Sequence, residues 1–220
     1  MRTIIVAPHP DDEVLGAGGT IFRRKAEDSV VAWLIVTSIS EDHGFSHNQV
    51  KQRGDDIKRV AEFFNFDFVY ELGFPTTKLD KIPISNIVTS ISDVFKSFEP
   101  IEVLVPHPAD VHTDHGVVFN AVVSCTKWFR YPSVKRVMAY ETLSETDFGL
   151  ESRKCFQPNL FVDISTFLES KLQAMDIYRS ELGTFPFPRS CEAIRALATL
   201  RGAASGFKAA EAFELLRERM

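Results

Sequence analysis

Short apolar runs alternate with longer segments of helical periodicity over the first two thirds of the chain, and this alternation constrains the fold more than any other feature. Strands that alternate with helices of this length predict βαβ units and a mainly parallel sheet. Right-handed crossovers would place the carboxyl ends of the strands on one edge of the sheet. The expected strands are residues 2–7, 30–37, 67–72, 101–105 and 134–141, and the expected helices are residues 14–28, 48–64, 84–98 and 114–129.

The last third of the chain follows this pattern less regularly. A further strand is expected at residues 160–164, helices at residues 166–182 and 193–200, and a terminal helix at residues 209–219. Gly73-Phe74-Pro75 is expected to end the third strand, because glycine and proline interrupt regular structure. With 220 residues, no internal repeat and no low-complexity linker, residues 1–220 are expected to form one α/β domain.

Composition excludes several classes of function. The net charge is −5 and no basic stripe is present, which argues against a nucleic-acid partner. No apolar run approaches the ~18 residues of a membrane span, and the first one is too short for a signal peptide, so we expect a cytoplasmic protein. Three widely spaced cysteines without a C-x-x-C pair fit a reducing compartment. The 19 phenylalanines are expected to fill the core and would permit a homo-oligomer interface.

A polar cluster, His9-Pro10-Asp11-Asp12-Glu13, directly follows the first apolar run. Pro10 disfavours a helical conformation at His9, so His9 and Asp12 can point at one spot from a rigid turn. The alternative is that Asp11 or Asp12 only caps the next helix. Residues of these types together at a strand end favour a metal or catalytic role, although Glu13 is expected to serve only the first helical turn.

A second cluster, His112-Thr113-Asp114-His115, follows the apolar run at residues 103–105. It too can be read as a polar loop in which Asp114 caps a helix. Two histidines within four residues favour function instead: one would be a metal ligand and the other an acid or oxyanion stabiliser. Asp114 could hold the second histidine in the required tautomer.

Both clusters are expected at the ligand-binding edge of the sheet. Two histidines and one aspartate can hold one metal ion and leave a coordination position open, which suits attack by a metal-bound water. The same ligand types form the site of non-haem Fe(II) oxygenases, so Fe²⁺ remains an alternative to Zn²⁺. An acidic residue beside the ligands favours hydrolysis. A non-catalytic metal- or sugar-binding module is a third hypothesis, against which Asp11 and His112 argue.

Other polar segments are weaker candidates. Gly16 and Gly18 resemble a dinucleotide loop, but the third glycine is missing at Ile21, so we expect them to let a helix pack closely on the sheet. Residues 38–47 are expected to touch substrate, with His43 and His47 as solvated loop residues. Arg53 could bind a substrate hydroxyl or anion, or form a surface ion pair. His107 and Asp110 either shape the pocket or build the loop, and both readings stay open.

These residues resemble the PIG-L/LmbE family of metal-dependent de-N-acetylases. Residues 7–13 with the following glycines are similar to its N-terminal signature, and residues 112–115 to its His-x-Asp-His signature. Arg53, residues 140–142 and residues 201–213 are also similar, so the resemblance covers nearly the whole chain.

The resemblance implies a Rossmann-like three-layer fold and removal of an N-acetyl group from an amino sugar or sugar conjugate, a small-molecule substrate. It implies a zinc ion held by His9, Asp12 and His115, with Asp11 as general base. It also implies that His112, oriented by Asp114, is the acid or oxyanion partner. Many members carry an aspartate after the third strand that contacts sugar hydroxyls, whereas this chain has threonines at positions 76 and 77.

Overall fold

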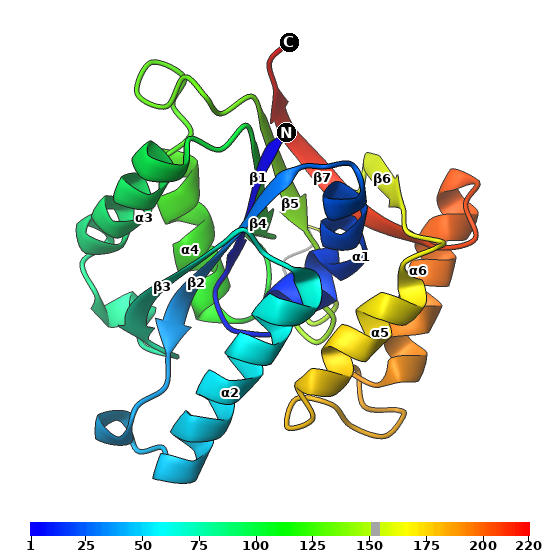
Figure 1. The fold of residues 1–220 in the computed structure, drawn as a ribbon, viewed down its shortest axis with the longest axis horizontal. Coiled ribbons are helices and arrows are strands. Elements are labelled where there is room, and N and C mark those ends of the chain that lie inside the picture. Colours follow the sequence, from blue (N-terminus) through cyan, green and yellow to red (C-terminus); the bar gives the residue numbers. More distant parts are fainter. Residues whose placement is uncertain (151–154) are drawn as a thin grey trace.

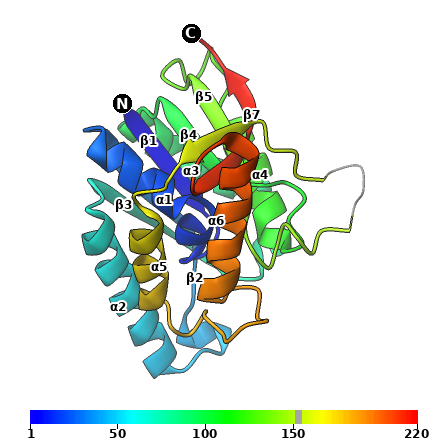
Figure 2. The same ribbon diagram turned by 90° about the vertical axis from the view of Figure 1, so that its right-hand side faces the viewer.

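The computed structural model describes residues 1–150 and 155–220, and these form one seven-stranded sheet between two layers of helices (Figures 1 and 2). The strand order is β3-β2-β1-β4-β5-β7-β6. Strands β1 to β5 run parallel, and β7 is antiparallel to both β5 and β6. The strands are β1 (Arg2–Ala7), β2 (Val30–Ser38), β3 (Phe68–Pro75), β4 (Glu102–Pro106), β5 (Arg136–Tyr140), β6 (Leu160–Asp163) and β7 (Ala210–Glu218).

Helices cover both faces of the sheet. The helices are α1 (Asp12–Ala26), α2 (His47–Phe64), α3 (Ile84–Phe98), α4 (Thr113–Ser124), α5 (Leu168–Ile177) and α6 (Cys191–Ser205), with short 3-10 turns η1 (Glu41–His43) and η2 (Leu79–Lys81). Alternate residues of β1 serve different layers: Ile4 and Val6 pack with α3 and α4, and Ile5 and Ala7 with the other helices. The expected three-layer α/β fold with a mainly parallel sheet is therefore confirmed.

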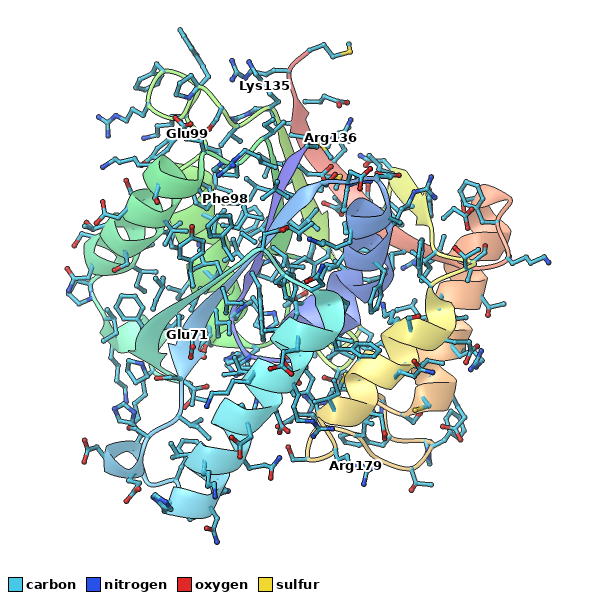
Figure 3. All side chains as sticks on the ribbon, viewed as in Figure 1. Glu71, Phe98, Glu99, Lys135, Arg136 and Arg179 are labelled. Carbon is cyan, nitrogen blue, oxygen red and sulfur yellow. The ribbon has the colours of Figure 1, made fainter. Side chains whose placement is uncertain are left out.

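The direction of the chain reverses between β1 and β4. From β1 the chain moves outward to β2 and β3, and it then returns to place β4 on the other side of β1. Such a switch point opens a crevice at the carboxyl ends of the two strands. Figure 3 labels Arg136 at the start of β5, at one end of the parallel strands, and Glu71 of β3, toward the other end.

The expected terminal helix at residues 209–219 is wrong, because the segment is strand β7. Its alanine, glutamate, leucine and arginine residues are good helix formers, which explains the expectation. The strand instead inserts between β5 and β6 and pairs with both, so all three gain their hydrogen-bond ladders. Ala210 to Phe213 are all buried in this position. Tertiary pairing has overridden local propensity.

Other boundaries differ from expectation by up to five residues; helix α5 ends at Ile177 rather than at residue 182, and helix α6 runs to Ser205 rather than to residue 200. Strand β3 does not end before Gly73 but continues to Pro75, because Gly73 has a φ of 71° and takes up a register shift against β2. Helix α4 ends at Ser124, five residues earlier than expected, and Tyr131 N donates to Lys127 O in a turn beyond it. Trp128 lies in that turn and is 62% exposed, so the helical periodicity continues in sequence without a surface to pack on.

Helix α1 packs closely on the sheet, as the glycines predicted. A Cβ atom on Gly16 would lie 2.1 Å from Cδ2 of Tyr140 in β5, and one on Gly19 would lie 2.6 Å from Ile164. The helix is kinked at Ala17, whose φ is −148°. None of the helices among the described residues is long and apolar enough to cross a membrane.

The kink in α1 creates a second helix start, which Glu211 of β7 caps. Its carboxylate accepts hydrogen bonds from Gly19 N at 2.8 Å and Thr20 N at 2.7 Å. Lys171 of α5 donates to Glu211 Oε1 at 2.7 Å and to Leu15 O at 2.8 Å. Both charged side chains are buried, so this network ties three elements together.

Candidate metal centre and active site

The first cluster occupies the turn between β1 and α1. Thr37 at the end of β2 donates to Pro8 O through both its N–H and its hydroxyl. Asp11 has a φ of 125°, an unfavourable conformation for a residue with a side chain, and its N–H donates to Glu13 Oε2 at 3.0 Å. Strained backbone persists only where the surroundings hold it, and such strain is common at functional sites. Glu13, which is fully buried, thus supports the turn at the start of the helix.

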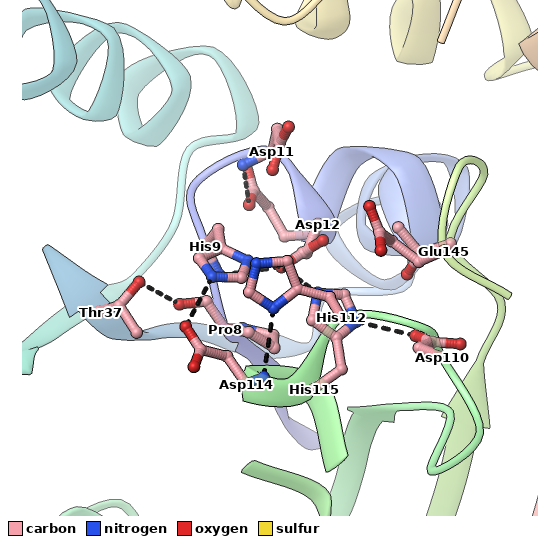
Figure 4. Close-up of polar contacts among 12 residues, drawn as sticks. Pro8, His9, Asp11, Asp12, Thr37, Asp110, His112, Asp114, His115 and Glu145 are labelled. Carbon is pink, nitrogen blue, oxygen red and sulfur yellow. Dashed lines mark hydrogen bonds and ion pairs between the residues drawn. The ribbon is translucent and has the colours of Figure 1, made fainter. Parts of the chain in front are cut away.

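The second cluster begins helix α4, which follows β4 across the switch point. His112 is the N-cap, and its Nδ1 accepts a hydrogen bond from Asp114 N at 3.2 Å. His115 follows in the first turn and is 1% exposed. Figure 4 shows the two clusters meeting, with His9 beside His112 and Asp12 above His115. The ring centroids of His9 and His112 are 4.5 Å apart.

Three donor atoms converge in the way that a metal ion requires. His9 Nδ1 and His115 Nε2 each lie 3.3 Å from Asp12 Oδ2, and the donor atoms of this trio all fall within 4.8 Å of one another. A tetrahedral site with bonds of about 2.0–2.1 Å has ligand atoms about 3.3–3.4 Å apart. The geometry and the donor types of His9, Asp12 and His115 therefore fit a zinc-like cation.

A carboxylate faces the other nitrogen of each imidazole. Asp114 Oδ2 lies 3.1 Å from His9 Nε2, and Asp110 Oδ2 lies 2.8 Å from His115 Nδ1. Carboxylates in this position fix the tautomer of a ligating histidine and raise its basicity. Asp110, whose role the sequence left open, therefore contacts a candidate ligand, and its sequence signal was its place in the loop that follows β4.

The carboxylate of Asp114 does not face His112, the histidine that it was expected to orient. Its carboxylate contacts His9, and it also accepts the N–H groups of Thr77 at 2.7 Å and Leu79 at 3.2 Å. Only its backbone N–H reaches His112. A second group of donors, from His9, His112 and Asp114, also lies within 4.8 Å, but these backbone hydrogen bonds commit Asp114 to a supporting role.

The candidate ligands lie in a strongly anionic environment. Burial lowers the pKa of His9, but hydrogen bonds with Asp114 and Asp12 outweigh burial and raise this pKa to about 9. Burial also opposes charge on His115, yet Asp12 and Asp110 raise its pKa well above the usual value. Burial would raise the pKa of Asp12, but the two imidazoles lower it. The group thus favours added positive charge, which a bound cation would supply in place of protons.

The pKa values of Asp11 and His112 are shifted in opposite directions. Burial and the neighbouring charge of Asp12 raise the pKa of Asp11 to about 7, although Arg189 Nη1 lies 3.2 Å from Asp11 Oδ2 and opposes this change. Burial and the charges of His9 and His115 lower the pKa of His112 to about 4. At neutral pH His112 is therefore an uncharged imidazole, and Asp11 lies close to its titration midpoint.

Arg53 and two residues of the loop after α5 form a linked group. Arg53 donates to Pro10 O at 2.9 Å and to Glu181 Oε1 at 2.5 Å. Glu181 also lies 3.6 Å from Arg189. The sequence pattern did not single out Glu181 and Arg189, because they lie in an irregular segment distant from both clusters.

The other histidines lie outside this centre. His43 Nδ1 contacts Ser40 Oγ at 2.9 Å, and His47, with a side chain 77% exposed, contacts Glu41 at 2.8 Å. Both are loop or helix-start residues, as expected. His107 is buried and lies 3.5 Å from Glu214, away from the ligands.

A cavity of about 460 Å³ opens over the cluster. One part of its wall is apolar and comes from α2 and the segment before it, which fits the expectation that residues 38–47 face substrate. The opposite part carries the polar clusters together with Glu145, a half-buried residue that sequence reasoning missed. The lining includes His9, Asp11, Asp12, Ile39, Phe45, Val50, Arg53, Ile57, Glu71, Thr76, Thr77, His112, His115, Thr142, Ser144, Glu145, Glu181 and Arg189.

Comparison with known proteins places the chain among deacetylases. A model of the GlcNAc-PI de-N-acetylase family, PIG-L, matches residues 4–126. The diacetylchitobiose deacetylase of Thermococcus kodakarensis is 26% identical over 96% of this chain and 81% of its own length. The structure of the conserved protein TT1542 from Thermus thermophilus matches with a TM-score of 0.79 and 26% identity, over 99% of this chain and 96% of that one.

A further solved structure separates fold from reaction. GalB, the 4-carboxy-2-hydroxymuconate hydratase from Pseudomonas putida, matches with a TM-score of 0.74 over 100% of this chain and 98% of that one. Its identity to this chain is 16%, so the likeness concerns the fold alone. The architecture by itself therefore does not select amide hydrolysis, and the reaction has to be argued from the site.

Proposed function

We propose, because the chain belongs to the GlcNAc-PI de-N-acetylase (PIG-L) family, that it hydrolyses the N-acetyl group of an amino sugar or sugar conjugate in this cavity. The observation that carries the proposal is the convergence of three candidate ligand atoms beside the Asp11 carboxylate. His9 Nδ1 and His115 Nε2 each lie 3.3 Å from Asp12 Oδ2. Diacetylchitobiose, on which the Thermococcus kodakarensis relative acts by name, indicates the kind of N-acetylated sugar that we expect as substrate.

His9, Asp12 and His115 would hold the metal ion, for which zinc is our proposal and ferrous iron the alternative. When bound, the ion would polarise the acetyl carbonyl group and lower the pKa of a water ligand to about 7. Asp110 and Asp114 would fix the tautomer of both imidazoles and keep the rings turned toward the ion.

Asp11 is the proposed general base. It lies next to the ligand Asp12 at the floor of the cavity, and its strained backbone conformation is held by Glu13. The carboxylate would accept a proton from the attacking water and, once protonated, would deliver it to the leaving amine. Arg189 contacts the same carboxylate and would fix its orientation.

His112 is the proposed hydrogen-bond donor to the developing oxyanion. Its Nδ1 accepts the Asp114 N–H, so a neutral His112 carries its proton on Nε2. A neutral imidazole held in this way is a preorganised N–H donor, and loss of one oxyanion donor typically costs about 2.7–4 kcal/mol of transition-state stabilisation. We therefore assign His112 to oxyanion stabilisation and the proton transfers to Asp11.

The test is acetate release from a panel of N-acetylated sugars by protein whose metal content per chain is measured. Asp11→Asn should abolish acetate release and leave metal content unchanged, because Asp11 is not among the ligands. Asp55→Asn is the matched control: Asp55 lies on the exposed side of α2, and its loss should leave the rate unchanged. Metal loss in Asp11→Asn would make Asp11 a ligand. Wild-type protein with one metal per chain that released no acetate from any N-acetylated sugar would contradict the proposal.

A further inference from the structure

A strained turn follows β5 and borders the cavity. Thr142 O accepts the N–H groups of Glu145 at 3.0 Å and Thr146 at 2.9 Å. Within this turn Ser144 has a φ of 75°, in the left-handed region that is unfavourable for a residue with a side chain. A glycine would relieve this cost, so the turn keeps a serine side chain at a position where backbone conformation does not favour one.

The turn is fastened to the candidate metal centre. Thr146 Oγ1 donates to Asp110 Oδ1 at 2.6 Å and accepts the N–H of Thr142 at 2.7 Å. The other oxygen of Asp110 contacts His115. Val111 N also donates to Glu145 O at 3.1 Å, so the backbone of Glu145 is tied to the loop that follows β4. The position of Glu145 relative to His115 is therefore fixed by a short chain of hydrogen bonds.

The carboxylate of Glu145 is free to accept further hydrogen bonds. It lines the cavity, and its one side-chain partner among the described residues is the hydroxyl of Ser144 at 3.1 Å. Figure 4 shows it on the opposite side of Asp12 from His9. Two other acidic groups of the cavity are engaged by cations, Asp11 by Arg189 and Glu181 by two arginines, and a third, Glu71 of β3, is exposed to solvent.

We propose that Glu145 accepts hydrogen bonds from hydroxyl groups of the sugar ring that carries the acetamido group. An ionised carboxylate only accepts hydrogen bonds, and its two oxygens match a pair of neighbouring hydroxyls. Neutral hydroxyls add no charge to a cavity that already holds Asp11 and Asp12. Glu145 is thus a specificity-determining residue that selects sugars over simple acetamides. This inference rests on the proposed function.

The test combines a variant of the protein with deletion of single substrate hydroxyls. The probes are methyl N-acetylglucosaminide and its 3-deoxy, 4-deoxy and 6-deoxy analogues. Glu145→Ala should lower kcat/KM for the parent sugar about 10- to 100-fold, the usual worth of a hydrogen bond to a charged group. The same substitution should have little effect on the analogue that lacks the contacted hydroxyl, and Glu145→Gln should fall between the wild type and Glu145→Ala.

Asp147→Ala is the matched control, because Asp147 is an exposed acidic residue two positions further along that does not line the cavity. It should leave kcat/KM unchanged for all four sugars. Equal losses in Glu145→Ala for the parent and every analogue, at unchanged metal content, would assign Glu145 to the support of the turn and overturn the proposal.

Binding without turnover separates this inference from the proposed function. Calorimetry should show that Asp11→Asn binds methyl N-acetylglucosaminide about 10- to 100-fold more tightly than Asp11→Asn with Glu145→Ala. If this difference in affinity is found while the wild type releases no acetate, the assignment of Glu145 is upheld and deacetylation is contradicted. Methyl glucosaminide carries a free amine in place of the acetamido group. If Glu145→Ala weakens its binding more than that of the acetylated sugar, the carboxylate binds an ammonium group and the hydroxyl assignment is overturned. Absence of sugar binding to Asp11→Asn would also overturn that assignment.

Discussion

Each candidate ligand imidazole has its own carboxylate behind it, and the two carboxylates are held differently. Asp114 accepts two backbone N–H groups from the segment after β3, whereas Asp110 accepts the hydroxyl of Thr146 from the turn after β5. His9 and His115 are thereby aligned by separate parts of the chain. The orientation of both rings is therefore built into the protein before any cation arrives.

Asp110→Asn should weaken metal affinity about 10- to 100-fold, the usual cost of altering a group that hydrogen-bonds a ligating histidine. The amide is less able than the carboxylate to accept the proton of His115 Nδ1, so the imidazole becomes a weaker donor to the metal. Competition with a chromophoric chelator measures the affinity. Asp80→Asn, at an exposed position in η2, should leave it unchanged, and equal affinities for wild type and Asp110→Asn would contradict the role assigned here.

At this scale the sequence predicts residues whose neighbours along the chain report their function. His9, Asp12 and His115 stand next to strand ends within short polar motifs, and the structure brings their donor atoms together. The carboxylate of Asp114 faces His9 and not His112, because which of two imidazoles a carboxylate faces depends on the path of the backbone around it. Glu145 carried no signal, since its placement depends on a turn whose shape local sequence does not specify.

At the scale of elements, Glu211 is the most connected side chain of β7. It caps the second part of α1 and pairs with Lys171 of α5, and both charged groups are buried. The kink at Ala17 exposes N–H groups that no residue of α1 itself can satisfy. The helix that begins with Asp12 is therefore completed by a strand nearly two hundred residues later.

Glu211→Gln should lower the free energy of unfolding by about 3–5 kcal/mol, because it leaves Lys171 buried without a counter-charge. Equilibrium unfolding in urea measures the change. Glu169→Gln removes an exposed partner of Arg195 and should have almost no effect. Similar losses in both variants would show that the buried pair contributes no more than a surface ion pair.

Elements were predictable where periodicity and burial agree. Helix α3 and strand β1 have the bounds expected from sequence, because the apolar stripe of α3 meets one face of the sheet and the apolar run of β1 is buried between the two helical layers. Strand β7 was not predictable, since its residues favour a helix and only the open edges of β5 and β6 select an extended chain. Helix α4 was overestimated, because periodicity does not report where the underlying sheet ends.

At the scale of the whole molecule, the candidate metal ligands connect two halves of the fold. His9 and Asp12 follow β1, and His115 follows β4, on opposite sides of the switch point. A cation bound by all three would therefore stabilise the folded state against unfolding of either half. It would also neutralise the carboxylates that crowd this edge of the sheet.

Metal removal should lower the thermal midpoint of unfolding, and the midpoint should rise with free metal concentration. A ligand that binds only the folded state at a free concentration 100 times its Kd adds about 2.7 kcal/mol. Differential scanning calorimetry with chelator and with graded zinc measures the dependence. Asp12→Asn should abolish it, and a wild-type midpoint that did not respond to metal would contradict a site formed by the folded chain.

The position of β7 between β5 and β6 also sets an order of events during translation. Strand β6 has β7 as its one neighbour in the sheet, yet residues 164–209 must be synthesised before β7 begins. At about 5–20 residues per second, this delay lasts roughly 2–9 s. During this interval β1 to β5, with all the candidate metal ligands, have already been synthesised, while Gly19 and Thr20 still lack Glu211. A nascent chain therefore holds all its candidate metal ligands before its sheet is closed, and the edge of β5 stays unpaired until β7 has been made.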